Sequence, residues 1–212
     1  MKDESNRLRF CTVHCSLSTV HFYYMTRTFI AVEIDSAIRS RAEELITLLR
    51  TAEADVKWVE TQNLHITLQF LGEVPEQQIA AACKAVEQGA AQVRPFDLEI
   101  GTAGAFPNSN RPRTLWIGAS AGSDQMAELH EFVALELAEL GYQDEDRKFQ
   151  THLTIGRTRS GKNVAELGRL LKQHAGFLAG RMRVEKATVF SSKLQRGGPL
   201  YEVLCTARLA GK

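Results

Sequence analysis

The chain lacks a strong net charge, long apolar runs and paired cysteine motifs. Its 26 basic and 25 acidic residues, among 212, leave a formal net charge of +1, whereas proteins that coat long nucleic acids usually carry a clearly basic surface. No apolar run reaches the roughly 18 residues that predict a membrane-spanning helix. These absences argue against a nucleic-acid coat and a membrane protein, and they leave room for a small or terminal anionic ligand.

The cysteine pattern indicates neither disulfides nor a metal site. The four cysteines show no CxxC spacing: Cys11, Cys15, Cys83 and Cys205. We expect reduced, mostly buried thiols, because a group formed by the first two with His14 and His21 matches no zinc-site spacing. The acidic first four residues do not resemble a signal peptide. The sequence therefore predicts a cytoplasmic protein with no metal and no other cofactor.

The chain divides into an extension and one folded region. Residues 1–24 show neither helical nor strand periodicity, and we expect them to lie outside the fold. A buried strand is predicted directly after Met25, at about 28–34. Residues 25–212 suffice for a two-lobed domain, and we expect this domain to be a monomer.

The first half of this domain predicts strand, helix, strand, helix, strand. Ser36 is the expected N-cap of the first helix. A strand that ends at Gly72 follows, and Pro75 fits the first turn of the second helix. Clean alternation of apolar and polar residues over 96–100 predicts the last strand of this half.

The second half predicts the same order of elements. A strand at 114–119 precedes a helix that begins at Ser123 and is closed by Gly141. Asn163 and Glu166 fit a capping box for the next helix. Two strands are expected to complete the chain, near 181–190 and 200–208. The repeated order indicates an internal duplication and two lobes that meet at a cleft.

Each half carries one His-apolar-Thr-apolar run, His65-Ile66-Thr67-Leu68 and His152-Leu153-Thr154-Ile155. Successive side chains of a strand point to opposite faces, so the histidine and threonine of each run share one face and the apolar residues take the other. A single His-x-Thr strand is most often structural. Its recurrence at equivalent positions of a duplicated plan favours two imidazoles opposed across the cleft.

Two opposed imidazoles suit in-line displacement at a phosphodiester. Histidine titrates near neutral pH, so one ring can take a proton from attacking water while the other protonates the departing ribose oxygen. The hydroxyls of Thr67 and Thr154 can donate hydrogen bonds to phosphate oxygens. The residues alone give no means of deciding which histidine is the donor.

Arg157 is a further candidate for binding phosphate, because a guanidinium group would neutralise its charge. Regular alternation places Arg157 on the face opposite His152. Only a bend or bulge, which Gly156 permits, would bring it into the cleft, and an ordinary surface arginine is the alternative. Three aromatic residues are candidates for stacking on a base, although strand aromatics mostly belong to the core: Trp58, Phe70 and Trp116.

The paired runs resemble the HxTx motifs of the two-histidine phosphoesterase superfamily. The longer strings 64–72 and 151–157, with Phe29-Ile30-Ala31-Val32, resemble its RNA 2′,3′-cyclic phosphodiesterase branch, once described as 2′-5′ RNA ligases. The resemblance covers about residues 25–208. It implies a bilobal α+β fold of two pseudo-twofold-related lobes, each with a mainly antiparallel sheet and flanking helices, and with the HxTx strands lining a central cleft.

The resemblance also implies a reaction, which is metal-independent hydrolysis of a terminal 2′,3′-cyclic phosphate to a 2′-phosphomonoester. The partners would be RNA ends or nucleotides that carry this phosphate. His65 would donate a proton to the ribose 3′ oxygen, and His152 would be the base that activates water. Thr67 and Thr154 would hold the phosphate.

Other functions stay open at this point. A non-catalytic module that binds RNA ends or nucleotides would keep the same cleft, and an esterase for 2′-5′ oligonucleotides or a small cyclic nucleotide would differ only in its loops. Ligation would be the reverse of a diesterase reaction, since the chain has no GxxxxGK loop for ATP. A metal-dependent phosphodiesterase is disfavoured, because magnesium prefers oxygen ligands and neither motif has a nearby Asp or Glu at ligand spacing.

Overall fold

The structure, a computed structural model, describes residues 24–144, 148–196 and 198–211. Its helices are α1 (Ser36–Arg50), α2 (Glu76–Ala90), α3 (Ser123–Ala138) and α4 (Val164–Gln173), with a 3₁₀ turn at Thr61–Asn63. Its strands are β1 (Met25–Glu33), β2 (Val56–Trp58), β3 (His65–Pro75), β4 (Phe96–Phe106), β5 (Thr114–Ala121), β6 (His152–Thr158), β7 (Leu178–Val184), β8 (Lys186–Gln195) and β9 (Gly198–Arg208). No helix within these ranges is long and apolar enough to cross a bilayer.

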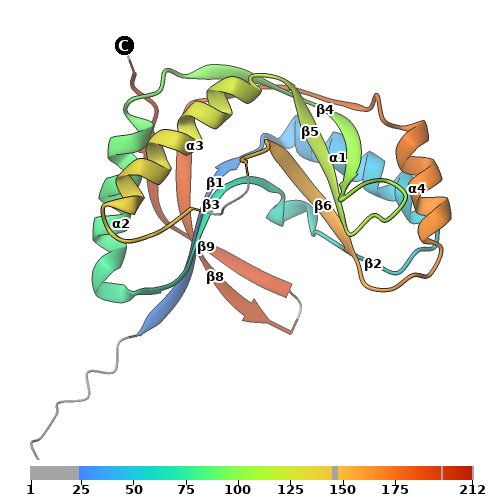
Figure 1. Cartoon of the computed structure of the whole chain (residues 1–212), viewed down its shortest axis with the longest axis horizontal. Helices are drawn as coiled ribbons and strands as arrows, with labels where there is room; N and C mark the ends of the chain where they lie inside the picture. The colour runs from blue at the N-terminus through green and yellow to red at the C-terminus, as the bar shows by residue number, and fades with distance from the viewer. Residues whose placement is uncertain (1–23, 145–147, 197, 212) are drawn as a thin grey trace, which may run out of the picture.

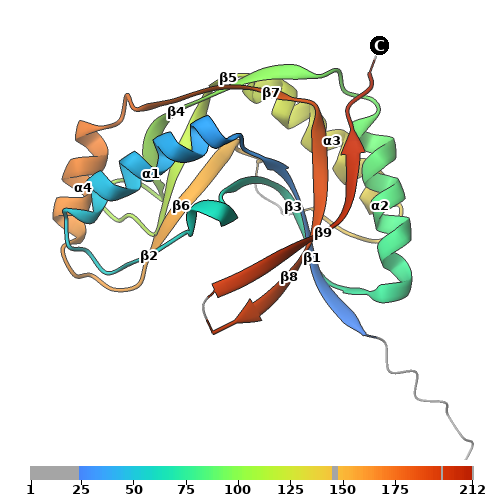
Figure 2. The ribbon, with the colours of Figure 1, turned by 180° about the vertical axis from the view of Figure 1, so that it is seen from behind.

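The strands form two antiparallel sheets. One has four strands in the order β3-β1-β8-β9, and the other has five in the order β2-β6-β5-β4-β7. Figures 1 and 2 show α2 and α3 together beside the four-stranded sheet, and α1 and α4 beside the five-stranded sheet. This arrangement confirms the bilobal α+β fold.

The two lobes do not coincide with the two halves of the sequence. β2 and β4 belong to the first half but lie in the five-stranded sheet, and α1 packs against β7. α3 belongs to the second half but packs against α2 in the other lobe. The four-stranded sheet is completed by the C-terminal hairpin β8-β9, which pairs with β1. Each lobe is therefore built from both halves of the chain.

One large apolar core extends through both lobes. Ile30, Leu45, Leu115 and Leu171 are among its fully buried members and come from different elements of both sheets and their helices. Burial of each such side chain stabilises the fold by about 1.5–3 kcal/mol. The two lobes thus share a core.

α2 and α3 approach each other closely at Gly89. A Cβ atom at this position would lie 2.7 Å from the Cα of Val133 and 2.8 Å from the carbonyl oxygen of Phe132. Both atoms belong to the backbone of α3. The contact between a helix of the first half and a helix of the second half therefore depends on a residue without a side chain.

Three predicted element boundaries are wrong. Asp35, rather than Ser36, caps α1, and its side chain accepts a hydrogen bond of 2.8 Å from the backbone N–H of Ile38. Both residue types can cap a helix, and the residue in extended conformation here is the aspartate. β3 does not end at Gly72, where φ is +72°, but continues to Pro75, which is the N-cap of α2 rather than part of its first turn.

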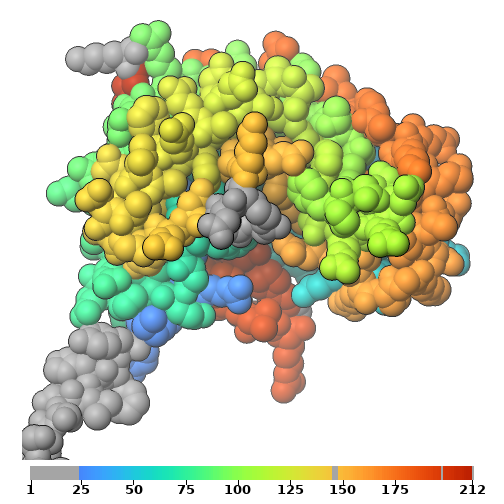
Figure 3. Space-filling view, in the orientation of Figure 1, coloured from blue at the N-terminus to red at the C-terminus, as the bar shows by residue number. Residues whose placement is uncertain are grey.

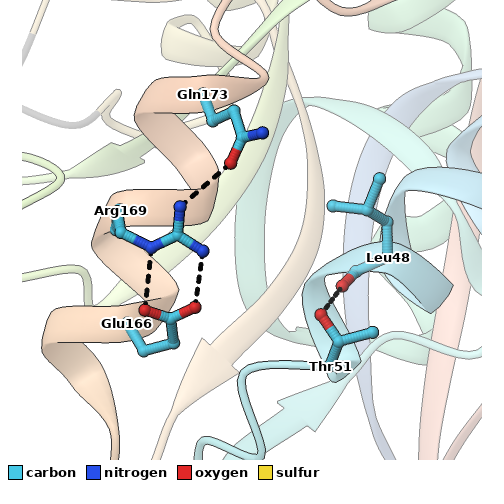
Figure 4. A network of polar contacts seen from close by, with 5 residues as sticks. All are labelled: Leu48, Thr51, Glu166, Arg169 and Gln173. Atoms are coloured by element: carbon cyan, nitrogen blue, oxygen red, sulfur yellow. Dashed lines mark hydrogen bonds and ion pairs between the residues drawn. The ribbon is translucent and has the colours of Figure 1, made fainter.

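The predicted capping box of α4 does not form. Asn163 is the N-cap, but its backbone is left-handed and its side chain donates to the carbonyl of Glu53 at 3.2 Å. Glu166 instead binds the guanidinium of Arg169 through two hydrogen bonds of 2.9 and 2.7 Å, and Arg169 also donates to Gln173 at 3.1 Å (Figure 4). A partner on the same helix has displaced the capping interaction.

Two strands are predicted at the C-terminal end, but the structure has three. β7 ends at Val184 and β8 begins at Lys186, and the chain passes from the five-stranded to the four-stranded sheet between them. No glycine or proline marks this crossing.

The expectation for residues 1–24 concerns residues outside the described part, apart from Tyr24. The carbonyl of Tyr24 accepts a hydrogen bond from the backbone N–H of Glu76.

Candidate active site

The two His-x-Thr strands, β3 and β6, are in contact where the lobes meet. Their apolar residues are buried: Ile66, Leu68, Leu153 and Ile155. Their polar residues are partly exposed: His65, Thr67, His152 and Thr154. The alternation predicted from the sequence is confirmed, since each strand turns its apolar residues to the core and its histidine and threonine away from it.

Each imidazole is held by the backbone two residues before it. The Nδ1 atom of His65 lies 2.8 Å from the carbonyl oxygen of Asn63, and that of His152 lies 2.7 Å from the carbonyl oxygen of Gln150. A carbonyl oxygen can only accept, so we assign the proton to Nδ1 and the lone pair of the neutral ring to Nε2. Both rings therefore offer the same nitrogen, Nε2, for proton transfer.

Aromatic rings lie beside both histidines. Tyr201 lies edge-on to His65, with ring centroids 5.4 Å apart, and Phe29 lies 4.9 Å from the same ring. On the other strand, Phe106 lies edge-on to His152 at 5.2 Å. Each imidazole thus has an aromatic neighbour edge-on to it, and His65 has further aromatic neighbours.

Burial lowers the pKa of both imidazoles below the usual 6.5, and the backbone carbonyl at each Nδ1 only partly offsets this effect. The positive charge of Arg157 lowers the pKa of His152 further. Desolvation disfavours the charged ring, and a nearby cation does the same. Both histidines are therefore neutral in the free protein at pH 7.

Arg157 lies on the same face of β6 as the motif residues. Trp116 of β5 pairs with Thr154, but Thr114 pairs with Arg157 rather than with Gly156. This shift of one residue is a β-bulge. Because Thr114 and Trp116 point to the same face of β5, their partners Arg157 and Thr154 do so as well. The bulge on which the sequence prediction depended is present.

The three aromatic candidates have different surroundings. Phe70 is 54% exposed and lies 6.0 Å from Phe29. Trp116 packs on Phe106 at 5.3 Å and covers Gly104, whose Cβ would lie 2.4 Å from the indole, so it is a packing residue. Trp58 is partly buried and lines a pocket.

The aromatic cluster beside His65 was not predicted from the sequence. Phe29 and Phe190 stack at 5.3 Å, and Tyr201 meets Phe29 edge-on at 4.9 Å. Phe29 comes from β1, which is far in the chain from the β8-β9 hairpin that supplies Phe190 and Tyr201. Nothing local in the sequence indicated that these residues would meet.

Cysteine and acidic residues give no sign of a metal centre in the part of the chain that the structure describes. Within it, no group of three or more His, Cys, Asp or Glu side chains is placed to hold a metal ion. Cys83 and Cys205 are free thiols, and both are partly buried rather than fully buried. Cys11 and Cys15 lie outside the described residues.

Comparison with protein families gives a match in each half of the chain. The profile described as LigT like Phosphoesterase matches residues 32–116 and again residues 117–201. The chain belongs to the LigT-like phosphoesterase family. The tandem match agrees with the internal duplication inferred from the order of the elements, and it confirms the resemblance carried by the paired HxTx runs.

Relatives of this LigT-like phosphoesterase cover most of its length. A protein of Methanothermobacter thermautotrophicus, named RNA 2′,3′-cyclic phosphodiesterase, is 32% identical over 183 residues, which cover 86% of this chain and 98% of the relative. A protein of the same name from Archaeoglobus fulgidus is 35% identical over 180 residues, covering 84% and 97%.

Solved structures share the fold. A crystal structure of a Thermus thermophilus protein matches with a TM-score of 0.73 at 28% identity and covers 88% of this chain and 99% of that one. E. coli LigT in complex with 3′-AMP matches with a TM-score of 0.68 at 23% identity, covering 88% and 98%. The second likeness is one of fold alone.

Proposed function

We propose that this LigT-like phosphoesterase hydrolyses the terminal 2′,3′-cyclic phosphate of RNA to a 2′-phosphomonoester. The observation that carries the proposal is the matched pair of imidazoles on contacting strands, His65 and His152, each with Nδ1 bound to a backbone carbonyl and Nε2 available. The names of the relatives support the substrate class. The proposal assigns the chemistry to these two rings.

The reaction needs one proton taken and one given. Nε2 of His152 removes a proton from water, whose oxygen forms a bond to phosphorus as the bond from phosphorus to the 3′ oxygen breaks. Nε2 of His65 gives a proton to that 3′ oxygen, and the phosphate stays on the 2′ oxygen. Exchange with solvent then restores both rings. Both rings offer Nε2 in the same way, so the direction of transfer rests on the family resemblance.

Substrate binding supplies the protonated donor. The pKa of His65 is lowered in the free protein, which opposes the charged ring. A cyclic phosphate carries one negative charge, and an adjacent negative charge raises the pKa of an imidazole. The phosphate therefore favours the protonated state of the ring that must donate. Exclusion of water by the aromatic neighbours strengthens this interaction.

Thr67, Thr154 and Arg157 are proposed to bind the phosphate. Each threonine shares the face of its histidine, two residues away, and a hydroxyl there can donate to a non-bridging oxygen. Arg157 reaches the same face through the β6 bulge, and its guanidinium can neutralise charge as it develops. These three side chains complete the proposed site.

Product analysis on short RNAs with a defined 2′,3′-cyclic end tests the proposal. In the presence of EDTA, wild-type protein should give a 2′-phosphate product, and His65→Ala and His152→Ala should each lower kcat by about 10²–10⁴-fold. His174→Ala is the control, because His174 lies directly after α4 and outside the site. Undiminished turnover by either site variant would overturn the assignment.

The same assay separates the other functions. Tight binding of cyclic-phosphate ends without any product would favour a binding module. Faster cleavage of 2′-5′ oligonucleotides than of cyclic ends would favour the related esterase, and joining of 2′,3′-cyclic to 5′-hydroxyl ends would reveal the reverse reaction. The monomeric state, the cytoplasmic location and the domain at 25–212 stay predictions, of which light scattering tests the first.

A further inference from the structure

We infer that a pocket beside the two histidines binds the phosphodiester and nucleoside that precede the terminal nucleotide, so that the enzyme prefers oligonucleotide ends to mononucleotides. This inference rests on the proposed function and specifies its substrate. The pocket has a volume of about 420 Å³, within the ~300–1,000 Å³ typical of small-molecule sites.

The pocket lies between β2, the end of β6 and the start of β9. The hairpin β8-β9 projects from the body of the molecule on this side (Figures 1 and 3). The side-chain amide of Asn63 donates to the carbonyl of Pro199 at 3.1 Å, which ties the hairpin to the 3₁₀ turn. The pocket wall is therefore fixed by contacts between segments distant in sequence.

Three of the pocket residues connect it directly to the proposed catalytic groups. Asn63 provides the carbonyl that holds His65, and Tyr201 lies edge-on to the same ring. Arg157 lines the pocket and lowers the pKa of His152. A ligand whose cyclic phosphate lies between the histidines therefore has this pocket as its immediate neighbour.

The charges that line the pocket favour an anion. Lys57, Arg157 and Arg159 line it, with Glu60 as the acidic residue among the lining side chains. Lys57 pairs with Arg157 across the β2-β6 ladder, and the carboxylate of Glu60 accepts from the side-chain amide of Gln62 at 2.6 Å. This local excess of two positive charges stands out in a chain with a net charge of +1.

The positive charge that lines the pocket exceeds what the terminal phosphate requires. Arg157 is already assigned to the cyclic phosphate, which leaves Lys57 and Arg159 for a second anion. The terminal nucleotide continues only through its 5′ oxygen, where an RNA chain carries its next phosphate. The remaining lining is largely apolar. Val56, Trp58 and Val59 also pack against the core, so Pro199 and Tyr201 are the apolar side chains that suit the sugar and base beyond it.

Three substrates test the inference: adenosine 2′,3′-cyclic phosphate, the same compound with a 5′-phosphate, and the dinucleotide ApA with a 2′,3′-cyclic phosphate. Wild-type kcat/KM should be higher for the second and third than for the first. Lys57→Gln and Arg159→Gln should each lower kcat/KM for these two roughly five- to tenfold. For adenosine 2′,3′-cyclic phosphate without a 5′-phosphate, kcat/KM should change by less than about twofold.

Lys84→Gln is the matched control, because Lys84 is a lysine on α2, outside this pocket. It removes the same charge and should leave all three substrates unchanged. The salt dependence gives an independent measure. The slope of log KM against log salt for the dinucleotide should become shallower by about 0.7 in Lys57→Gln, as expected for one lost phosphate contact on a single strand.

Two results would overturn the inference. One is a wild-type enzyme with equal kcat/KM for all three substrates, and the other is an equal loss on all three in the Lys57 and Arg159 variants. Calorimetric titration with the 2′-phosphate forms of adenosine and ApA makes the comparison without turnover. Tighter, Lys57-dependent binding of the dinucleotide with no hydrolysis of any substrate would keep the pocket assignment and refute the proposed function.

Discussion

Gly89→Ala should destabilise the protein, although alanine is the better helix former. A Cβ at this position would lie 2.7 Å from the Cα of Val133 and 2.8 Å from both its backbone nitrogen and the carbonyl oxygen of Phe132. Carbon atoms normally pack at about 3.5–4.0 Å, so α2 and α3 would have to separate by roughly 0.8 Å or more. No side chain can rotate away, because all three atoms belong to the backbone.

The expected change in the free energy of unfolding combines two opposing effects. Overpacking typically costs about 1–3 kcal/mol, and contact with three backbone atoms favours the upper end. Replacing a glycine inside a helix by alanine stabilises the helix by about 1 kcal/mol. The net loss is about 2 kcal/mol, which corresponds to a fall in Tm of about 4–8 °C for a protein of this size.

Urea unfolding followed by circular dichroism measures this loss, with a lower midpoint and an unchanged slope. Gly176→Ala is the control, since a Cβ there meets nothing within 4 Å, and it should keep or slightly raise stability. If Gly89→Ala were as stable as the wild type, the close approach of the two helices would not contribute as argued.

Other predictions concern the site and its thiols. Because burial lowers the pKa of His65 and His152 below 6.5, kcat/KM should peak below pH 6.5. The maximum of kcat should lie at higher pH, since bound phosphate raises the pKa of both histidines. Arg157→Gln should move the acidic limb of the kcat/KM profile to higher pH, because loss of the cation raises the pKa of His152. Thr154→Val should lower kcat/KM about tenfold or more, whereas Thr154→Ser should retain most activity. Burial raises the pKa of Cys205, so alkylation with iodoacetamide at pH 8 should be slow until urea is added.

Local patterns were sufficient to predict the faces of the motif strands. Alternation in 65–68 and 152–155 placed the histidines and threonines away from the core, and the structure agrees. Periodicity also predicted the helices, because each must bury one stripe. The dependence of Arg157 on a bulge could be stated in advance, but the bulge itself is set by pairing with β5.

The remaining features depend on partners that no local pattern specifies. The exchange of strands between lobes follows from pairing between distant segments, and Tyr201 meets His65 only because β8 joins β1. The wrong caps have a different cause. Asp35 and Ser36 are equally suitable by chemistry as N-caps. Glu166 binds an arginine one turn further along its own helix instead of the backbone at the helix start.

The exchange of elements between the lobes determines the order in which the site can be assembled during synthesis. β1 is paired on one side with β3 and on the other with β8, whose Ser191 lies opposite Thr28. Pairing across such a sequence separation makes folding slow. The ribosome releases the first histidine strand early, but its sheet and its tyrosine neighbour are completed only when the last strands emerge. A fragment that ends after the first family match, at residue 116, should therefore lack a stable site.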